Sequence, residues 1–269
     1  MKANGGWKWS HLYLIAVFVV LYAPILYLVV YSFNSGGTMH GYDGFTLEWY
    51  GEVFSDTRLL IIVLNTFVVA LFSSLLSTIL GIVGAIAIHR VRRQRTKSAL
   101  LSLNNVLIVN PDVVIGASFL ILFTMIGLKL GFGSVLISHV AFSVPIVVLM
   151  ILPKLQEMNP SLVDAAKDLG ANGWDVLTKV ILPYIKSGVF AGFFMALTYS
   201  LDDFAVTFFV TGNGFSTLSV EIYSRARQGV ALNINALSTL LFLFTILLVV
   251  GYYLITRRNG RIQEAGARL

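Results

Sequence analysis

The stretch that decides the fold is residues 158–183, MNPSLVDAAKDLGANGWDVLTKVILP, which carries polar residues between two strongly apolar runs. Asn159 or Ser161 is placed to cap a short helix, and Pro160 suits its opening turn. Gly170 is placed to end that helix, because glycine enters the left-handed conformation without steric penalty. A second short helix is expected to follow and to end at the closing proline. The stretch therefore predicts two short helices joined by a glycine turn.

The first of these short helices has a small apolar face. Residues at three- and four-residue spacing lie on one side of a helix, and here they are Leu162, Ala165, Ala166 and Leu169. Such a face suits either an amphipathic loop at the membrane surface or a docking element for a partner protein.

The composition of the chain is that of a membrane protein. Hydrophobic residues make up 57% of the sequence, charged residues 12%, and the mean hydropathy is +0.83. A soluble domain of this length is far less apolar. There is no cysteine, so disulfides and thiolate sites are excluded. We expect a single all-α, polytopic membrane domain over residues 1–269.

Six apolar segments approach the ~20 residues that a helix needs to cross a bilayer. They cover residues 12–33, 59–88, 99–128, 135–152, 188–211 and 236–256. The first is long, contains Pro24 and lacks a small-residue cleavage site. We therefore expect it to be a membrane span rather than a cleaved signal peptide.

The basic residues predict the orientation of these six spans. With the N-terminus in the cytoplasm, 15 of the 19 Lys and Arg residues fall on the cytoplasmic side, as the positive-inside rule requires. Both termini and residues 158–183 then face the cytoplasm, the latter between spans four and five. The basic cluster at residues 90–97 is expected to lie beside anionic membrane lipid and to set the orientation of the neighbouring spans, rather than to bind nucleic acid.

Span three is interrupted by Asn110, Pro111 and Asp112. Proline breaks the hydrogen-bond ladder of a helix. Asn110 is placed to cap the helix that restarts, with Asp112 satisfying freed amides. Alternatively, Asp112 takes part in transport. An ionised carboxylate at this depth costs ~2.5–3.5 kcal/mol, so it is expected to face a water-filled cavity or a cation, as a transport residue does.

Span five carries a second acidic anomaly, Asp202 and Asp203, with Tyr199 one turn earlier. At 1.5 Å per residue, Asp112 and Asp202 lie ~20 and ~21 Å from the cytoplasmic ends of their spans. This matching depth predicts one acidic chamber for a cationic substrate. Adjacent helical positions point about 100° apart, so only one of the two neighbouring acids is expected to face it. The alternative is that Arg225 and Arg227 simply neutralise these acids.

Two other residues are candidates with simpler explanations. Trp49 belongs to a short amphipathic helix expected over residues 46–54 and either anchors it among lipid headgroups or meets a cation at the outer mouth. His139 is expected to be a packed, hydrogen-bonded core residue without a functional role.

No phosphate-binding loop, zinc-protease motif or nucleophile elbow occurs in the chain. We therefore assign no catalytic residue, no metal site and no cofactor. We expect a transport protein rather than an enzyme.

The cytoplasmic stretch resembles a known motif. Its pattern D-A-A-x3-G-x9-V-x-L-P is similar to the E-A-A-x3-G-x9-I-x-L-P motif in permease subunits of bacterial ABC importers, with Asp164 for Glu and Val180 for Ile. The resemblance implies that this element couples to a separate ATP-binding subunit, which binds ATP and magnesium. The residues implied are Asp164, Ala165, Ala166, Gly170, Leu182 and Pro183.

The resemblance extends over nearly the whole chain to spermidine/putrescine permeases of the PotC type. It rests on YSFN at 31–34, EWY at 48–50, NPD at 110–112, AAKDLGA at 165–171, LDD at 201–203, FVTG at 209–212 and NAL at 235–237. It implies polyamine import across the bacterial cytoplasmic membrane with a second, PotB-like permease, an ATPase dimer and an extracytoplasmic polyamine-binding protein. The substrate path would use Asp112, Asp202, Asp203, Tyr199 and Trp49.

Three other functions stay open at this point. The chain could import another cation, such as iron or thiamine, whereas oxyanions match membrane acids poorly. It could be a proton-coupled secondary transporter or channel with Asp112 and Asp203 as a relay. A structural scaffold would have no need of buried carboxylates.

Overall fold

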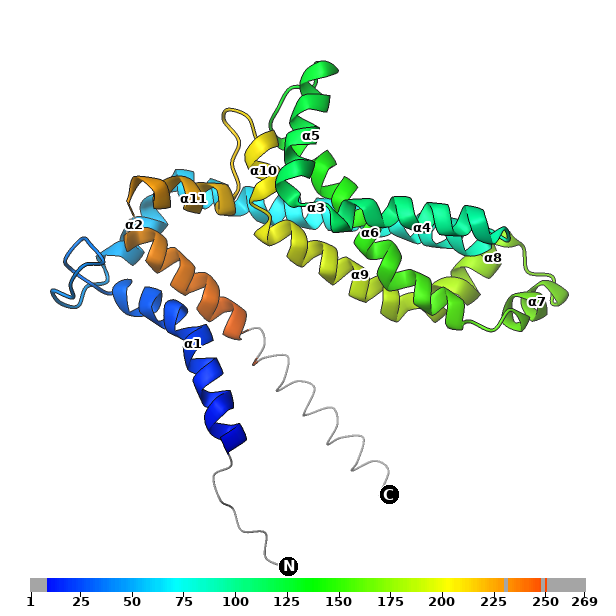
Figure 1. Cartoon of the computed structure of the whole chain (residues 1–269), viewed down its shortest axis with the longest axis horizontal. Helices are drawn as coiled ribbons and strands as arrows, with labels where there is room; N and C mark the ends of the chain where they lie inside the picture. The colour runs from blue at the N-terminus through cyan, green and yellow to red at the C-terminus, as the bar shows by residue number, and fades with distance from the viewer. Residues whose placement is uncertain (1–8, 230–231, 248–249, 251–269) are drawn as a thin grey trace, which may run out of the picture. The chain divides into compact units, whose positions relative to one another are not determined.

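The computed structural model describes residues 9–229, 232–247 and 250 (Figure 1). Those residues form helices and connecting loops, with one isolated antiparallel bridge between Asn34 and Phe45. The all-α prediction is confirmed. The chain divides into two compact units, one made of Met1–Leu60 with Ser224–Leu269, the other of Ile61–Tyr223.

The first unit holds an outer loop organised by one buried side chain. Its helices are α1 (Trp9–Tyr31), α2 (Glu48–Ser55), the first residues of α3 (Thr57–Arg90), the end of α11 (Leu218–Gln228) and a helix at Leu232–Leu247. The Asn34 amide donates to the carbonyls of Thr38 and Gly41 at 2.8 and 2.7 Å and accepts from the Asp43 N–H at 2.8 Å. The loop is thus closed around Asn34.

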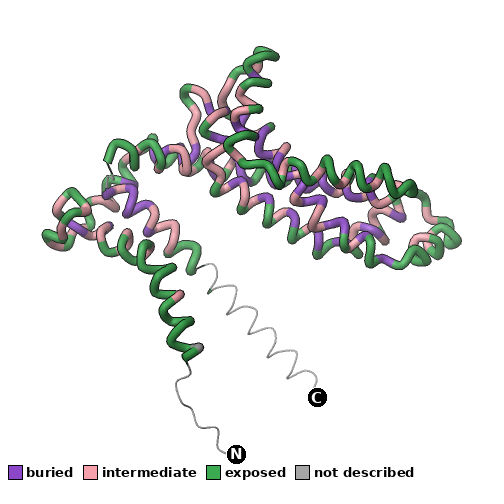
Figure 2. The backbone as a smooth tube through the Cα atoms, in the orientation of Figure 1, coloured by how far each residue is buried: buried purple, intermediate pink, exposed green. Residues whose placement is uncertain are grey.

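The second unit carries the candidate site. Besides most of α3, it contains α4 (Gln94–Val109), α5 (Asp112–Met125), α6 (Phe132–Glu157), α7 (Ser161–Asp168), α8 (Gly173–Val176), a π-helical turn (Leu177–Ile181), α9 (Leu182–Asp202) and α10 (Ala205–Val210). Its most extensive helix pairing joins α6 to α9. Buried residues follow both helices (Figure 2), with Val147, Ile151, Leu155, Ile185 and Ala196 in one core cluster.

Small residues allow α6 and α9 to approach closely. A Cβ added at Gly188 would lie 2.8 Å from the carbonyl oxygen of Met150 and 3.3 Å from the Cα of Ile151. Backbone atoms cannot yield as a side chain can, so the two helices would have to separate. This is the packing mode expected between helices in a membrane.

We expect Gly188→Ala to lower the free energy of unfolding by about 1–3 kcal/mol, because it overpacks this contact. The measurement is the thermal unfolding midpoint in detergent. Gly133→Ala is the matched control, since an added Cβ there meets no atom within 4 Å. Equal midpoints for the two variants would contradict the close approach.

Four helices among the described residues are long and apolar enough to cross a membrane. They are α1, α3, α6 and the continuous helical run Gly173–Asp202, and the bent pair α4 and α5 makes a fifth span if counted as one. The sixth expected segment, residues 236–256, overlaps the shorter helix Leu232–Leu247, and its later part lies outside the described residues. The chain therefore has several helices long and apolar enough to span a membrane, and the count of six stays a prediction.

The prediction that Pro183 ends the second cytoplasmic helix is wrong. The chain stays helical from Gly173 to Asp202. A π-helical turn precedes the proline, and the N–H of Leu182 donates to the carbonyl of Leu177. This wider turn accommodates a residue that has no N–H to donate.

Candidate functional site

The first helix of the 158–183 stretch, α7, has well-defined ends. Asn159, rather than Ser161, supplies the capping side chain, since its Oδ1 accepts from the Ser161 N–H at 3.0 Å. Gly170 has φ +84°, the left-handed conformation expected for it. The N–H of Ala171 reaches the carbonyl of Ala166 at 3.0 Å, and that of Gly170 reaches Lys167 at 2.8 Å. These two bonds form a Schellman motif.

The second helix, α8, is capped by a residue that sequence reasoning missed. The Asn172 Oδ1 accepts from the N–H groups of Trp174 and Asp175 at 2.9 and 3.0 Å. The signal was present, because asparagine just before a helical run is a favoured N-cap. An ion pair between Lys179 and Asp175 at 2.6 Å crosses the following turn.

The two short helices leave apolar side chains uncovered in the isolated chain. Val163 and Ala166 pack against the α6–α9 core cluster, so the expected single apolar face is divided. Leu162 and Ala165 point outward, and Leu169 is 89% exposed. The exposed acid Asp164 lies 3.9 Å from Lys167. Both Leu182, which is half-buried, and the exposed Pro183 lie in the continuing helix.

The acidic candidates lie at two helix breaks in the same unit. The break between α4 and α5 falls at Asn110 and Pro111, where the axes bend by 101°. No side chain caps α5, so the predicted capping role of Asn110 is wrong: Pro111 occupies the N-cap, and its carbonyl accepts from Ile115 at 3.2 Å. The second break follows Asp202, where Asp203 is extended and α10 starts two residues later.

Asp112 is brought together with Tyr199. The tyrosine hydroxyl donates to Oδ1 of Asp112 at 2.8 Å, across 87 positions of sequence. The ring of Tyr199 meets that of Phe142 edge-on, with centroids 5.0 Å apart. The expected neighbourhood of Asp112 and Tyr199 is therefore present in the structure.

The two adjacent acids have different surroundings. Asp203 caps α10, because its carboxylate accepts from the N–H of Thr207 at 2.8 Å, its hydroxyl at 2.7 Å and the N–H of Val206 at 3.3 Å. Its side chain is 5% exposed. Asp202 is exposed and lies within electrostatic range of both Asp112 and Asp203. Of the pair, Asp202 is the one available to a ligand.

Asp203 belongs to a buried polar network centred on His139. The imidazole is fully buried, with Nδ1 2.6 Å from the Ser200 hydroxyl and Nε2 2.8 Å from that of Thr207. Since the Thr207 hydroxyl gives its one proton to Asp203, it accepts from His139, which places the imidazole proton on Nε2. The Ser200 hydroxyl accepts in turn from Ser73 at 2.9 Å. The network connects α3, α6, α9 and α10.

We expect His139→Ala to lower the free energy of unfolding by about 1–3 kcal/mol, because it leaves buried hydroxyls without partners. The measurement is the thermal unfolding midpoint of the purified chain. His40→Ala removes the same side chain from an exposed loop position and should leave the midpoint unchanged. If His139→Ala lowered the unfolding midpoint no more than His40→Ala does, the buried network would make no contribution to stability.

Trp49 and Arg225 have partners within the first unit. The Trp49 Nε1–H donates to the carbonyl of Asn34 at 2.7 Å, and its ring is half-buried. Arg225 lies 3.4 Å from Asp56. The pKa of the Asp56 carboxyl lies below its usual value. The main cause is the hydrogen bond from the Leu59 N–H, and the Arg225 guanidinium lowers it further. Within the described residues, no three His, Asp or Glu side chains are grouped so that they could hold a metal ion.

Comparison with known proteins identifies the family and the fold of the chain. The family model described as the binding-protein-dependent transport system inner membrane component matches residues 77–262. A solved structure of a bacterial ABC transporter involved in import of the acidic polysaccharide alginate shares the fold. Its TM-score is 0.70 at 18% identity, with 91% of this chain and 92% of that chain covered.

Two curated relatives are similar over nearly the full length. The spermidine/putrescine transport system permease protein PotC of Escherichia coli (strain K12) is 36% identical over 245 residues, covering 91% of this chain and 92% of the relative. The putrescine transport system permease protein PotI of the same strain is 33% identical over 264 residues, covering 95% and 94%. The chain belongs to the family of binding-protein-dependent transport system inner membrane components.

Proposed function

We propose that this chain is a permease subunit of an ATP-driven ABC importer and forms, with a second PotB-like permease, the path by which polyamines enter the cytoplasm. The observation that carries the proposal is the 36% identity, over nine-tenths of the chain, to a permease named for spermidine and putrescine. In this proposal the chain has six spans in the bacterial inner membrane and both termini in the cytoplasm.

The acidic residues offer a physical basis for the substrate. A polyamine must give up water to cross the membrane, and fixed carboxylates in a low-dielectric cavity offset that loss. Asp112 and Asp202 stand on different helices, each beside a break in the helical chain. Tyr199 orients Asp112 through its hydroxyl. Two acids within interaction range suit a substrate with more than one positive charge.

The cytoplasmic element supplies the coupling. Its exposed Leu162, Ala165 and Leu169 form a surface for the groove of an ATP-binding subunit, in the manner of helix-in-groove recognition. ATP and magnesium are bound by that subunit, which acts as a dimer, so this chain is not itself the enzyme. An extracytoplasmic binding protein delivers the polyamine, and ATP-driven movement of the element switches the access of the acidic site.

The proton-coupled alternative receives less support. A relay through Asp203 needs a carboxylate that water can reach, whereas this one is 5% exposed and accepts three hydrogen bonds from α10. Such a carboxylate serves as a helix cap.

The test is uptake of radiolabelled spermidine into proteoliposomes that hold this chain, the second permease and the ATPase, with the binding protein added outside. We expect uptake to require internal ATP and to persist when an ionophore collapses the proton gradient. Excess putrescine should compete, whereas ferric iron and thiamine should not. Uptake that is lost with the proton gradient and indifferent to ATP would favour the secondary transporter.

A further inference from the structure

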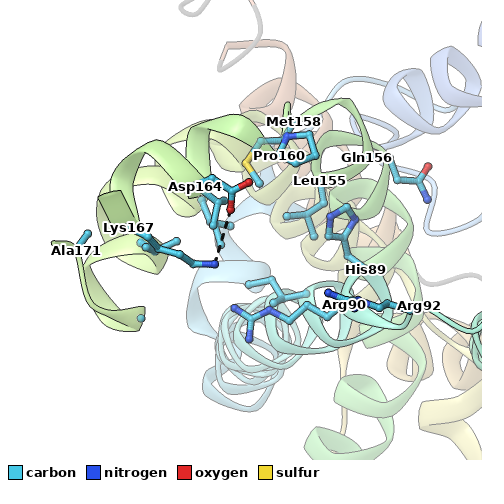
Figure 3. Close-up of a pocket in the computed structure, with 15 residues that line it drawn as sticks. His89, Arg90, Arg92, Leu155, Gln156, Met158, Pro160, Asp164, Lys167 and Ala171 are labelled. Carbon is cyan, nitrogen blue, oxygen red and sulfur yellow. Dashed lines mark ion pairs between the residues drawn. The ribbon is translucent and has the colours of Figure 1, made fainter. Parts of the chain in front are cut away.

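A cavity of about 950 Å³ lies between the end of α3 and the cytoplasmic element. Its walls come from α3, from the end of α6, from α7 and from the π-helical turn, all within the second unit (Figure 3). This volume is at the upper end of the range of small-molecule sites. The transport path proposed above uses none of its basic residues.

One part of the cavity wall is strongly basic. Arg90 and Arg92 come from the end of α3 and the loop after it, and Lys167 comes from α7. Among the described residues, neither arginine has an acidic side chain within ion-pair distance. Asp164 is the one acid in the described lining, and it lies 3.9 Å from Lys167. The lining thus has a net positive charge with two uncompensated guanidinium groups.

A histidine lies in the same wall as the arginines. His89 lines the cavity, and its Nδ1 is buried without a hydrogen-bond partner among the described residues. A buried nitrogen without a partner is costly. Because this nitrogen is not exposed to the cavity, the charged contacts expected for a ligand on this wall come from Arg90 and Arg92.

Apart from Gln156, the rest of the wall is mainly apolar. It is formed at the ends of the membrane-spanning helices by Ile86 of α3, Leu155 of α6 and Met158 after it, and is completed by Val163 of α7 and Ile181. A small soluble anion has no use for such a surface. A ligand that carries both a phosphate and a hydrocarbon chain matches both parts of the wall.

We propose that this cavity binds an anionic phospholipid, with the phosphate at Arg90 and Arg92 and the glycerol and upper acyl carbons along the apolar wall. Basic pockets between spanning helices on the cytoplasmic side are suited to such headgroups. The assignment rests on the cytoplasmic orientation proposed above. A bound lipid would contact both the end of α3 and α7, and so would stabilise the position of the element that meets the ATPase.

The test is titration of the purified full-length chain in neutral detergent with a short-chain phosphatidylglycerol, with bound lipid counted by native mass spectrometry. The test variant carries Arg90→Gln and Arg92→Gln together. The control carries Arg93→Gln and Arg95→Gln, which removes the same charge from exposed neighbours that do not line the cavity. We expect the test variant to bind about thirtyfold more weakly than the unchanged chain and the control to bind as the unchanged chain does.

Three outcomes would overturn the proposal. The first is equal affinity of the test and control variants. The second is equal affinity for phosphatidylcholine of the same chain length, and the third is binding of inorganic phosphate as tight as that of the lipid. Because the titration needs neither ATPase nor polyamine, its failure would leave the proposed transport function untouched, and a failure of transport would leave the lipid site standing.

Discussion

Replacing Gly170 by aspartate is expected to lower ATP-driven uptake by about tenfold or more while ATP hydrolysis by the partner continues, a loss within the usual range of coupling energies. Gly170 has φ +84°, and a Cβ there meets nothing within 4 Å in this chain. The folded chain therefore has room for the new side chain, at a backbone cost of roughly 1–2 kcal/mol. In the proposed complex, a partner groove around the turn between α7 and α8 would leave no room for that side chain.

The control for this prediction is Gly127→Asp. Gly127 also has a left-handed backbone, φ +71°, with nothing within 4 Å of an added Cβ. It follows α5, on the side that the proposed topology places away from the ATPase. The two variants thus carry equal charge and similar strain, and we expect only Gly170→Asp to uncouple ATP hydrolysis from uptake in proteoliposomes. Intact coupling in Gly170→Asp would count against the docking role.

The local features of the 158–183 stretch could be predicted from the sequence. The cap of α7, the left-handed Gly170 and the helices on either side all depend on residues a few positions apart. Such short-range interactions can be predicted from the spacing of residues in the sequence. The π-helical turn before Pro183 could not be predicted, because a proline in the sequence is equally consistent with the end of a helix and with a wider turn that accommodates it.

The acidic site could be predicted only in part, for a related reason. Equal depth placed Asp112 and Asp202 in one region, with Tyr199 one turn before Asp202. The hydrogen bond between Tyr199 and Asp112 nevertheless joins residues 87 positions apart. The partners of His139 are 61 and 68 positions away, and no spacing rule reaches that far. Whether Asp202 or Asp203 caps α10 depends on where the chain breaks before that helix. The position of the break depends on tertiary packing.

The different surroundings of Asp202 and Asp203 predict different consequences for the same substitution. We expect Asp202→Asn to reduce spermidine uptake about tenfold and to leave the thermal midpoint unchanged, because its exposed carboxylate caps no helix in the way Asp203 caps α10. A tenfold change corresponds to ~1.4 kcal/mol, well within the ~4 kcal/mol of a close charge pair near a protein surface. Asp112→Asn should behave similarly, since the remaining amide oxygen can still accept from Tyr199. The measurements are uptake in proteoliposomes and unfolding in detergent.

Asp203→Asn should instead destabilise the fold, by about 1–3 kcal/mol. Both of its oxygens accept from donors of α10, Oδ1 from Val206 and Oδ2 from the N–H and hydroxyl of Thr207. An amide nitrogen in place of either oxygen would face a donor, and no rotation of the side chain avoids this. A drop in midpoint for Asp203→Asn alone, with reduced uptake but an unchanged midpoint in Asp202→Asn and Asp112→Asn, would separate the cap from the transport acids. Full spermidine uptake in both Asp112→Asn and Asp202→Asn would remove the acidic site from the mechanism.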